Sequence, residues 1–251
     1  MSSDTTTPAP LGRRTLLKGV TALGAGLALG QAGFLPSLGA EAAAPETIQD
    51  ILDITVTTEM FGVTFLGAAL DSNARGNFDP PWLPLEVAIV TAARGQEQAH
   101  LDFFMGLGGR PLTRTFNAPN PLILRDRTLF FDTVVRQETR EVAAQLAAMT
   151  TFVAQQRPDL VKVSYQYAAE EAEHRLVASY SLGTRPANNY GYAPMLYETV
   201  AEYLAEIRAA GIIDGPTGAM MFPGPGTIDY RNVIERTPSG PAANGASSPI
   251  R

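Results

Sequence analysis

Two short Glu-x-x-His motifs contain every histidine of the chain. Glu97 precedes His100 by three positions, and Glu171 precedes His174 by three positions. Residues three apart on a helix lie one turn apart on the same face, so each motif offers a carboxylate and an imidazole to one ion. With 14 glutamates in 251 residues, chance would place a glutamate at this spacing before both histidines in roughly 0.3% of cases. The pattern therefore indicates a metal site rather than two surface ion pairs.

Four amphipathic segments have the length needed to position these motifs. Apolar residues recur every three or four positions, as is typical of helices, over residues 45–75, 84–106, 126–154 and 160–182. The second and fourth segments carry the two motifs, while the first and third carry Glu59 and Glu138 in phase with their apolar residues. Short turns separate the first segment from the second and the third from the fourth.

The connection between the second and third segments, residues 110–125, is rich in Pro, Asn and Thr and is long for a compact domain. Sixteen extended residues span about 50 Å, whereas a 25-residue helix is about 37 Å long. The connection can therefore return to the end of the molecule where the second segment began. The sequence predicts an all-α fold of two antiparallel helical hairpins joined by one long crossover.

The four glutamates fall at one depth in such an arrangement. Residues equidistant from the turn of an antiparallel hairpin lie level. Glu59 and Glu97 are equidistant from residue 78, in the first turn, and Glu138 and Glu171 are equidistant from the edge of the second. Burying four carboxylates on otherwise apolar faces costs several kcal/mol each unless something compensates. A pair of divalent cations would supply that compensation.

This ligand set resembles that of the ferritin-like dinuclear carboxylate proteins, which take one glutamate from each of two helices and a Glu-x-x-His motif from each of the other two. The resemblance covers roughly residues 46–184. It implies a ferritin-like four-helix bundle with two Fe or Mn ions as cofactors. Carried over by position, it implies that Glu59, Glu97 and His100 serve one ion and that Glu138, Glu171 and His174 serve the other, with one or two glutamates bridging both.

Neighbouring residues offer alternatives. Glu141 is roughly level with the site but falls off the apolar stripe of its segment, so Glu138 is preferred as the ligand. The resemblance implies that Glu170 hydrogen-bonds an imidazole across the site, whereas Gln96 stands at the equivalent position of the other motif. Tyr167, one turn before the second motif, is either a hydrogen-bonding or redox-active phenol near the ions or a packed core residue.

The two ends of the chain differ from residues 45–184, the expected bundle. Arg13-Arg14 followed by a mildly apolar Gly/Ala-rich run resembles a twin-arginine (Tat) signal peptide over residues 1–44. It predicts export to the periplasm or the exterior, with no permanent membrane span after cleavage. A membrane anchor and a disordered basic tail are the alternatives. Residues 185–236 are predicted to form an extension with one helix, at 195–210, and residues 237–251 a disordered tail.

Composition narrows the function classes. The net charge of −6 argues against a nucleic-acid partner. The absence of cysteine excludes disulfides, thiolate nucleophiles, iron–sulfur clusters and a rubredoxin-type centre. Oxygen-rich ligands with one imidazole per ion favour Fe or Mn. The oligomeric state stays open, a homo-oligomer included.

The expected function is an oxidoreductase of the cell envelope that oxidises Fe(II) or reduces peroxide, with dioxygen or peroxide as its small partner. Disproportionation of peroxide, as in a manganese catalase, is an alternative within enzymes. A second alternative is a non-enzymatic metal-binding protein with a structural role, as in stress- or desiccation-related relatives of the superfamily. Iron storage in a cage is the third, although the long C-terminal extension does not resemble the closing helix of a cage-forming ferritin.

Overall fold

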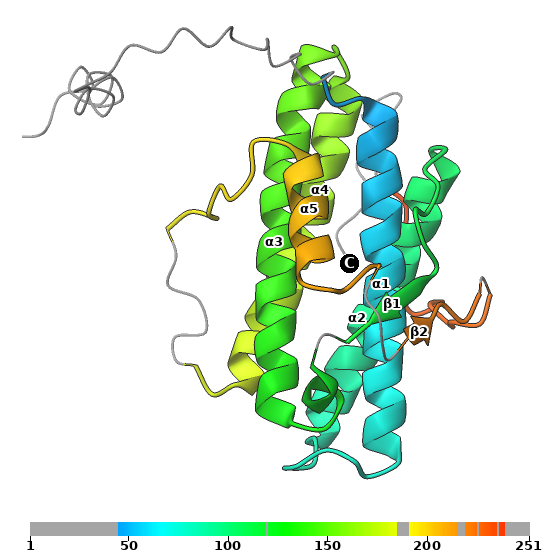
Figure 1. Cartoon of the computed structure of the whole chain (residues 1–251), viewed down its shortest axis with the longest axis vertical. Coiled ribbons are helices and arrows are strands. Elements are labelled where there is room, and N and C mark those ends of the chain that lie inside the picture. The colour runs from blue at the N-terminus through cyan, green and yellow to red at the C-terminus, as the bar shows by residue number, and fades with distance from the viewer. Residues whose placement is uncertain are drawn as a thin grey trace, which may run out of the picture. The chain divides into compact units, whose positions relative to one another are not determined.

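The computed structural model describes residues 45–118, 120–184, 191–214, 219–224, 226–234 and 236–238. The expected signal peptide at 1–44 lies outside the described residues, as does most of the expected tail at 237–251. The elements in chain order are α1 (Ile48–Ala74), α2 (Pro84–Gly106), β1 (Thr115–Asn117), a 3-10 helix (Pro121–Leu124), α3 (Arg127–Ala154), α4 (Pro158–Ser181), α5 (Val200–Ala209) and β2 (Ala219–Met221). The described part is mainly helical, as the sequence predicted (Figure 1).

The four long helices pair as consecutive antiparallel neighbours, α1 with α2 and α3 with α4 (Figure 1). Side-chain caps fix where they begin, because the first backbone N–H groups of a helix lack partners within it. The Thr47 hydroxyl accepts from Asp50 N at 3.1 Å, and the Asp126 carboxylate accepts from Leu129 N at 2.9 Å. These caps place the first residues of α1 and α3 slightly later than the apolar periodicity predicted.

The connection from α2 to α3 runs along α1. At its beginning, Arg110 N donates to the Asp53 carboxylate at 2.7 Å. At its end, the Ser72 hydroxyl donates to the Leu124 carbonyl at 2.7 Å. Because Asp53 lies in the first turns of α1 and Ser72 in its last turn, the connection travels nearly the whole length of that helix, as its length allowed.

The structure also contains elements that the sequence did not predict. β1, inside the long connection, pairs antiparallel with β2 of the C-terminal extension, with Phe116 opposite Met220. The extension helix begins at Val200 rather than near 195, because Thr199 caps it by accepting from Glu202 N. α5 packs on α1 and α3, where Tyr203 and Ile207 are buried.

The core is rich in aromatic residues near the turn between α1 and α2. Trp82 packs against Phe78 and Phe130, with ring centroids 4.8 Å apart in both pairs. Among the described helices, α1 alone is long and apolar enough to cross a membrane, a feature that the sequence prediction did not anticipate. In the structure 83% of the 18-residue apolar stretch of this helix is buried. Burial between α2, α3, α5 and β2 therefore accounts for its apolar character.

Candidate metal centre

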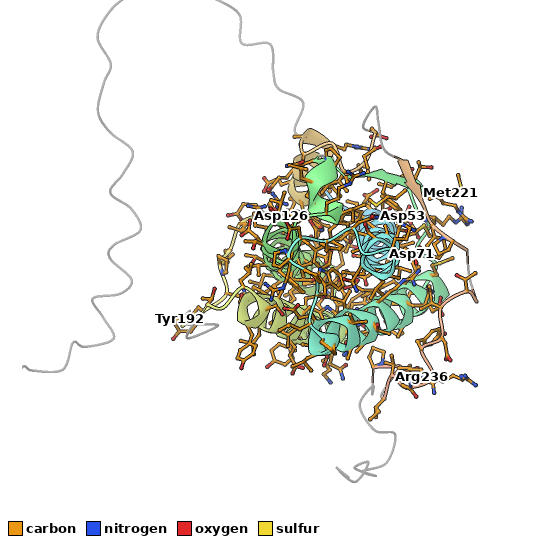
Figure 2. The ribbon with its side chains drawn as sticks, turned by 90° about the horizontal axis from the view of Figure 1, so that it is seen from below. Asp53, Asp71, Asp126, Tyr192, Met221 and Arg236 are labelled. Atoms are coloured by element: carbon orange, nitrogen blue, oxygen red, sulfur yellow. The ribbon has the colours of Figure 1, made fainter. Side chains whose placement is uncertain are left out.

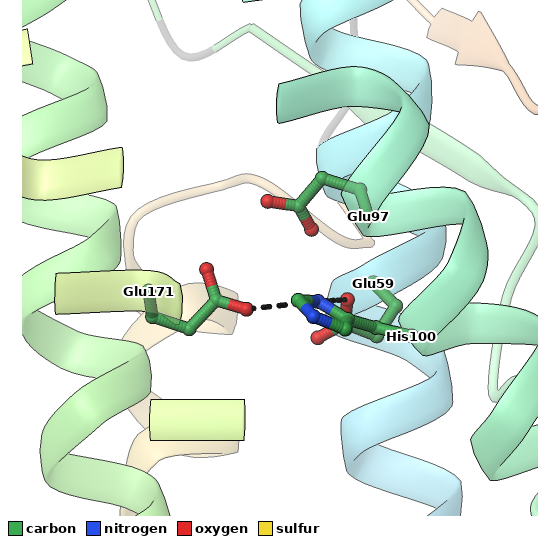
Figure 3. A group of neighbouring side chains, drawn as sticks. All are labelled: Glu59, Glu97, His100 and Glu171. Atoms are coloured by element: carbon green, nitrogen blue, oxygen red, sulfur yellow. Dashed lines mark ion pairs between the residues drawn. The ribbon is translucent and has the colours of Figure 1, made fainter. Parts of the chain in front are cut away.

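The structure brings the six predicted ligand residues together midway along the four long helices. Their ligand atoms form two groups of four, and within each group the atoms lie within 4.8 Å of one another. One group is Glu59, Glu97, His100 and Glu171 (Figure 3), and the other is Glu97, Glu138, Glu171 and His174. All six are buried except His100, whose side chain is 17% exposed. Each group contains residues from both helical pairs, and Glu97 and Glu171 belong to both groups.

Both imidazoles direct the same ring nitrogen at the carboxylates. His100 Nδ1 lies 3.1 Å from Glu171 Oε1 and 3.3 Å from Glu59 Oε2 (Figure 3). His174 Nδ1 lies 3.0 Å from Glu171 Oε2 and 3.3 Å from Glu97 Oε1. Glu171 thus presents one carboxylate oxygen to each imidazole.

Several ligand atoms of this cluster are buried without a hydrogen bond. They are Glu59 Oε2, Glu97 Oε2, Glu138 Oε2, Glu171 Oε1 and His100 Nδ1. The Nδ1 atom of His100 is within ion-pair distance of two carboxylates but has hydrogen-bond geometry to neither. A buried polar atom without a partner costs about 1–3 kcal/mol, and a charged one costs more. Five such atoms aimed at one region fit a bound cation, which would coordinate them.

The ionisation of the cluster without an ion follows from burial and mutual repulsion. Burial raises the pKa of Glu59 and of Glu138 well above the usual range, and neighbouring carboxylates raise both further. Burial also opposes ionisation of Glu171, but the two imidazoles outweigh it and lower the pKa of Glu171 below its usual range. Burial lowers the pKa of His100, yet its contacts with Glu171 and Glu59 prevail and raise that pKa to about 10. Without a metal the cluster therefore retains protons, which a cation would displace.

The Nε2 atom of His174 contacts the side chain of Gln96, the residue just before the other Glu-x-x-His motif. This atom lies 3.1 Å from Gln96 Oε1, and the Gln96 amide in turn donates to Glu170 Oε2 at 3.4 Å. A ring N–H held by an acceptor leaves the other nitrogen unprotonated and oriented for a metal. Gln96 thus occupies the position where the resemblance implied an acidic residue. The Glu170 carboxylate accepts a hydrogen bond from Gln96, whereas the resemblance implied a hydrogen bond to an imidazole.

Glu141 differs from the sequence prediction, which put it off the inward stripe. It is buried, and its Oε1 accepts from Gln137 at 3.0 Å and from the Tyr203 hydroxyl at 3.1 Å. Burial raises the pKa of Glu141 well above its usual range, and Glu171 and Glu97 raise it further. Sequence reasoning placed Tyr203 on the apolar side of the extension helix but connected neither Tyr203 nor Gln137 with the site. The available signal was spacing on one helix: Gln137 lies four residues before Glu141 and Glu138 lies three residues before it, and both spacings place residues on the same face.

Two further residues shape the site from α4 and α1. The Tyr167 hydroxyl donates to Glu59 Oε1, and its ring meets that of His100 edge-on at 4.9 Å. Tyr167 is therefore both packed and hydrogen-bonded to the cluster. Gly62 leaves room for Glu97, because a Cβ atom at this position would lie 2.5 Å from Glu97 Oε2.

No protein-family model, curated protein or solved structure matches this chain. Buried glutamate and histidine groups that could hold metal ions are present in the described residues.

Proposed function

We propose that this chain is a ferritin-like four-helix-bundle protein that binds two Fe or Mn ions and oxidises Fe(II) or reduces peroxide at them. The observation that carries the proposal is that six residues form two groups of four sharing Glu97 and Glu171, and that five of these six have a buried ligand atom without a hydrogen bond. The antiparallel pairing of the helices and a connection that runs the length of α1 support the ferritin-like topology.

Charge counting supports two ions rather than one. The two groups contain four carboxylates, in Glu59, Glu97, Glu138 and Glu171. Ionised, they carry four negative charges, which two divalent cations with neutral imidazoles balance completely. One divalent cation would leave two negative charges buried, a costly state in a protein interior.

The donor set supports the choice of metal and of chemistry. Carboxylate oxygens with one imidazole per ion suit Fe or Mn, and the chain has no thiolate for softer ions. Oxidation of two Fe(II) ions to Fe(III) supplies two electrons. With two protons these electrons reduce one dioxygen to hydrogen peroxide, or one peroxide to two waters. The residues of this chain contribute ligands, a low-dielectric enclosure and the hydrogen bonds that orient Glu59 and His174.

We propose that the protein is also exported. A Tat-type signal at residues 1–44 would carry a folded, metal-loaded protein to the cell envelope. A structural role for the ions is the second candidate, because both groups contain residues from both helical pairs and would hold the pairs together.

Metal analysis and aerobic oxidation separate these proposals. We expect the mature chain to contain two ions, and we expect the Glu171→Ala variant, which lacks a carboxylate of both groups, to contain fewer than one. Glu173→Ala is the matched control, because Glu173 is an exposed glutamate two positions away on α4. If the protein oxidises Fe(II) under air no faster than buffer does, the oxidoreductase proposal is excluded and the structural role of the ions is the remaining candidate. Full metal content in Glu171→Ala would overturn the site itself.

A further inference from the structure

A small, mostly apolar cavity is lined by residues of all four long helices, including two of the candidate metal ligands. Its volume is about 20 Å³, above the roughly 10–15 Å³ that one water molecule requires. Glu138 and His174 are its two polar lining residues, and the other residues that line it, Val134 and Ala178 among them, are apolar. The cavity therefore has room for a small molecule in contact with two candidate ligands.

Two of the residues that line this cavity, Ile89 of α2 and Val177 of α4, are half-buried, whereas its other lining residues are buried, so these two mark its solvent-facing edge. Viewed along the helices, α2 and α4 lie on the side of the molecule away from α5 (Figure 2). The opposite side is closed in the described structure, since α5 packs on α1 and α3 and buries Tyr203 there. A cavity on that side, next to Gly62, measures only about 10 Å³. Of these two cavities beside the cluster, the one with Ile89 and Val177 at its edge is the larger.

The chemistry of the walls selects among small oxidants. Hydrogen peroxide has two hydroxyl groups, and moving a hydroxyl from water into an apolar site without a hydrogen bond is unfavourable. Dioxygen makes no hydrogen bonds of comparable strength in water, so it loses little on entering such a passage. Genuinely apolar cavities in proteins are dry and accept apolar molecules such as xenon.

We infer that this cavity is the access and holding site for dioxygen, and that Ile89 and Val177 control admission to it. The inference rests on the proposed function and narrows it, since it makes dioxygen rather than peroxide the oxidant that the site receives. Each dioxygen admitted takes two electrons from two Fe(II) ions and two protons from solvent, and leaves as hydrogen peroxide.

The test compares two valine-to-phenylalanine changes on the same helix. Val177→Phe closes the cavity mouth, whereas Val163→Phe enlarges another half-buried valine of α4 that does not line the cavity. We expect Fe(II) oxidation by dioxygen to slow by about tenfold in Val177→Phe, equivalent to ~1.4 kcal/mol on the barrier, and to stay near the wild-type rate in Val163→Phe. Ile89→Phe, on the facing helix, is the second blocking variant if Val177→Phe does not fold.

Xenon binding gives a readout that does not depend on activity. In crystals of the metal-loaded protein under xenon pressure, we expect one xenon atom beside Ala178 in the wild type and in Val163→Phe, and none in Val177→Phe. Peroxide supplied without air should oxidise Fe(II) equally fast in both variants. Equal dioxygen rates in the two variants, or retained xenon in Val177→Phe, would overturn the inference, and equal slowing with both oxidants would overturn the selectivity. Wild-type protein that does not oxidise Fe(II) at all would instead contradict the proposed function.

Discussion

Replacing Glu138 by glutamine should have opposite effects on the metal-free and metal-loaded protein. Glu138 is fully buried, and its Oε2 has no hydrogen-bond partner. Burial, followed by the nearby carboxylates of Glu171, Glu141 and Glu97, raises its pKa well above the usual range. Without an ion this side chain is a net cost to folding, whereas with an ion it is a ligand. Glutamine keeps the shape and removes the charge, so it separates the two contributions.

The magnitudes follow from the burial. A buried polar group without a partner costs about 1–3 kcal/mol, and a charged one costs more, so we expect metal-free Glu138→Gln to gain about 2 kcal/mol. For a domain of this size that raises the unfolding midpoint by about 4–8 °C. In the loaded protein, losing a ligand should weaken binding at least as much as losing a group that orients one, which costs about 10–100-fold. A hundredfold loss, at a metal concentration 1,000 times the original Kd, removes about 2.7 kcal/mol of stabilisation.

Thermal unfolding followed by circular dichroism measures both effects, once with a chelator and once with excess Mn(II). Glu173→Gln is the control, since this exposed glutamate should change neither midpoint. The reasoning is refuted if Glu138→Gln lowers the midpoint in both conditions, because Glu138 would then stabilise the fold without any metal. An unchanged metal-induced shift would refute its role as a ligand.

Three further predictions concern pH, a hydrogen bond and a close contact. Because the pKa of His100 rises from 6.5 to about 10 on folding, its stabilisation of the metal-free protein is complete below pH 6.5 and is lost as the pH rises towards 10. Urea unfolding across this range should show that decline, while metal affinity should increase with pH because protons compete with the ions. Tyr203→Phe removes a donor to buried Glu141 and should cost about 1–2 kcal/mol in urea unfolding; an unshifted midpoint at equal slope would contradict this. Gly62→Ala places a Cβ atom 2.5 Å from Glu97 Oε2 and should lower the metal content of folded protein below that of the wild type, which elemental analysis would detect.

The sequence predicted the helices well because each long helix buries a face, and burial imposes a three- to four-residue period on the apolar residues. The predicted first residues of the helices were less accurate. Side-chain caps such as Thr47 and Thr199 determine where a helix begins, and the apolar periodicity does not. The β1–β2 pair could not be predicted, because it joins three-residue segments about 100 positions apart and neither alternates long enough to be seen. Its register depends on where the long connection and the extension meet in space.

The six predicted ligands converge because equal distance from a hairpin turn is a geometric property that the sequence contains. Glu141 was misjudged for a different reason. Its carboxylate accepts a hydrogen bond from Tyr203 of α5. The apolar periodicity of α3 alone cannot show that α5, which comes later in the chain, packs against this helix. Likewise, the contact of Gln96 with His174 joins two motifs, and only the packing of α2 against α4 brings these residues together.

The ligand set alone does not separate an enzyme from a protein that uses metal as a clamp, because both roles need the same buried carboxylates between the two helical pairs. What separates them is access. A structural ion is best enclosed on every side, since exchange with solvent would only weaken the clamp. Here one imidazole, that of His100, is partly exposed, and a small cavity with half-buried lining residues on α2 and α4 touches Glu138 and His174. Access of this kind is required for turnover and has no use in a structural metal site, so it supports the proposal of a centre that reacts.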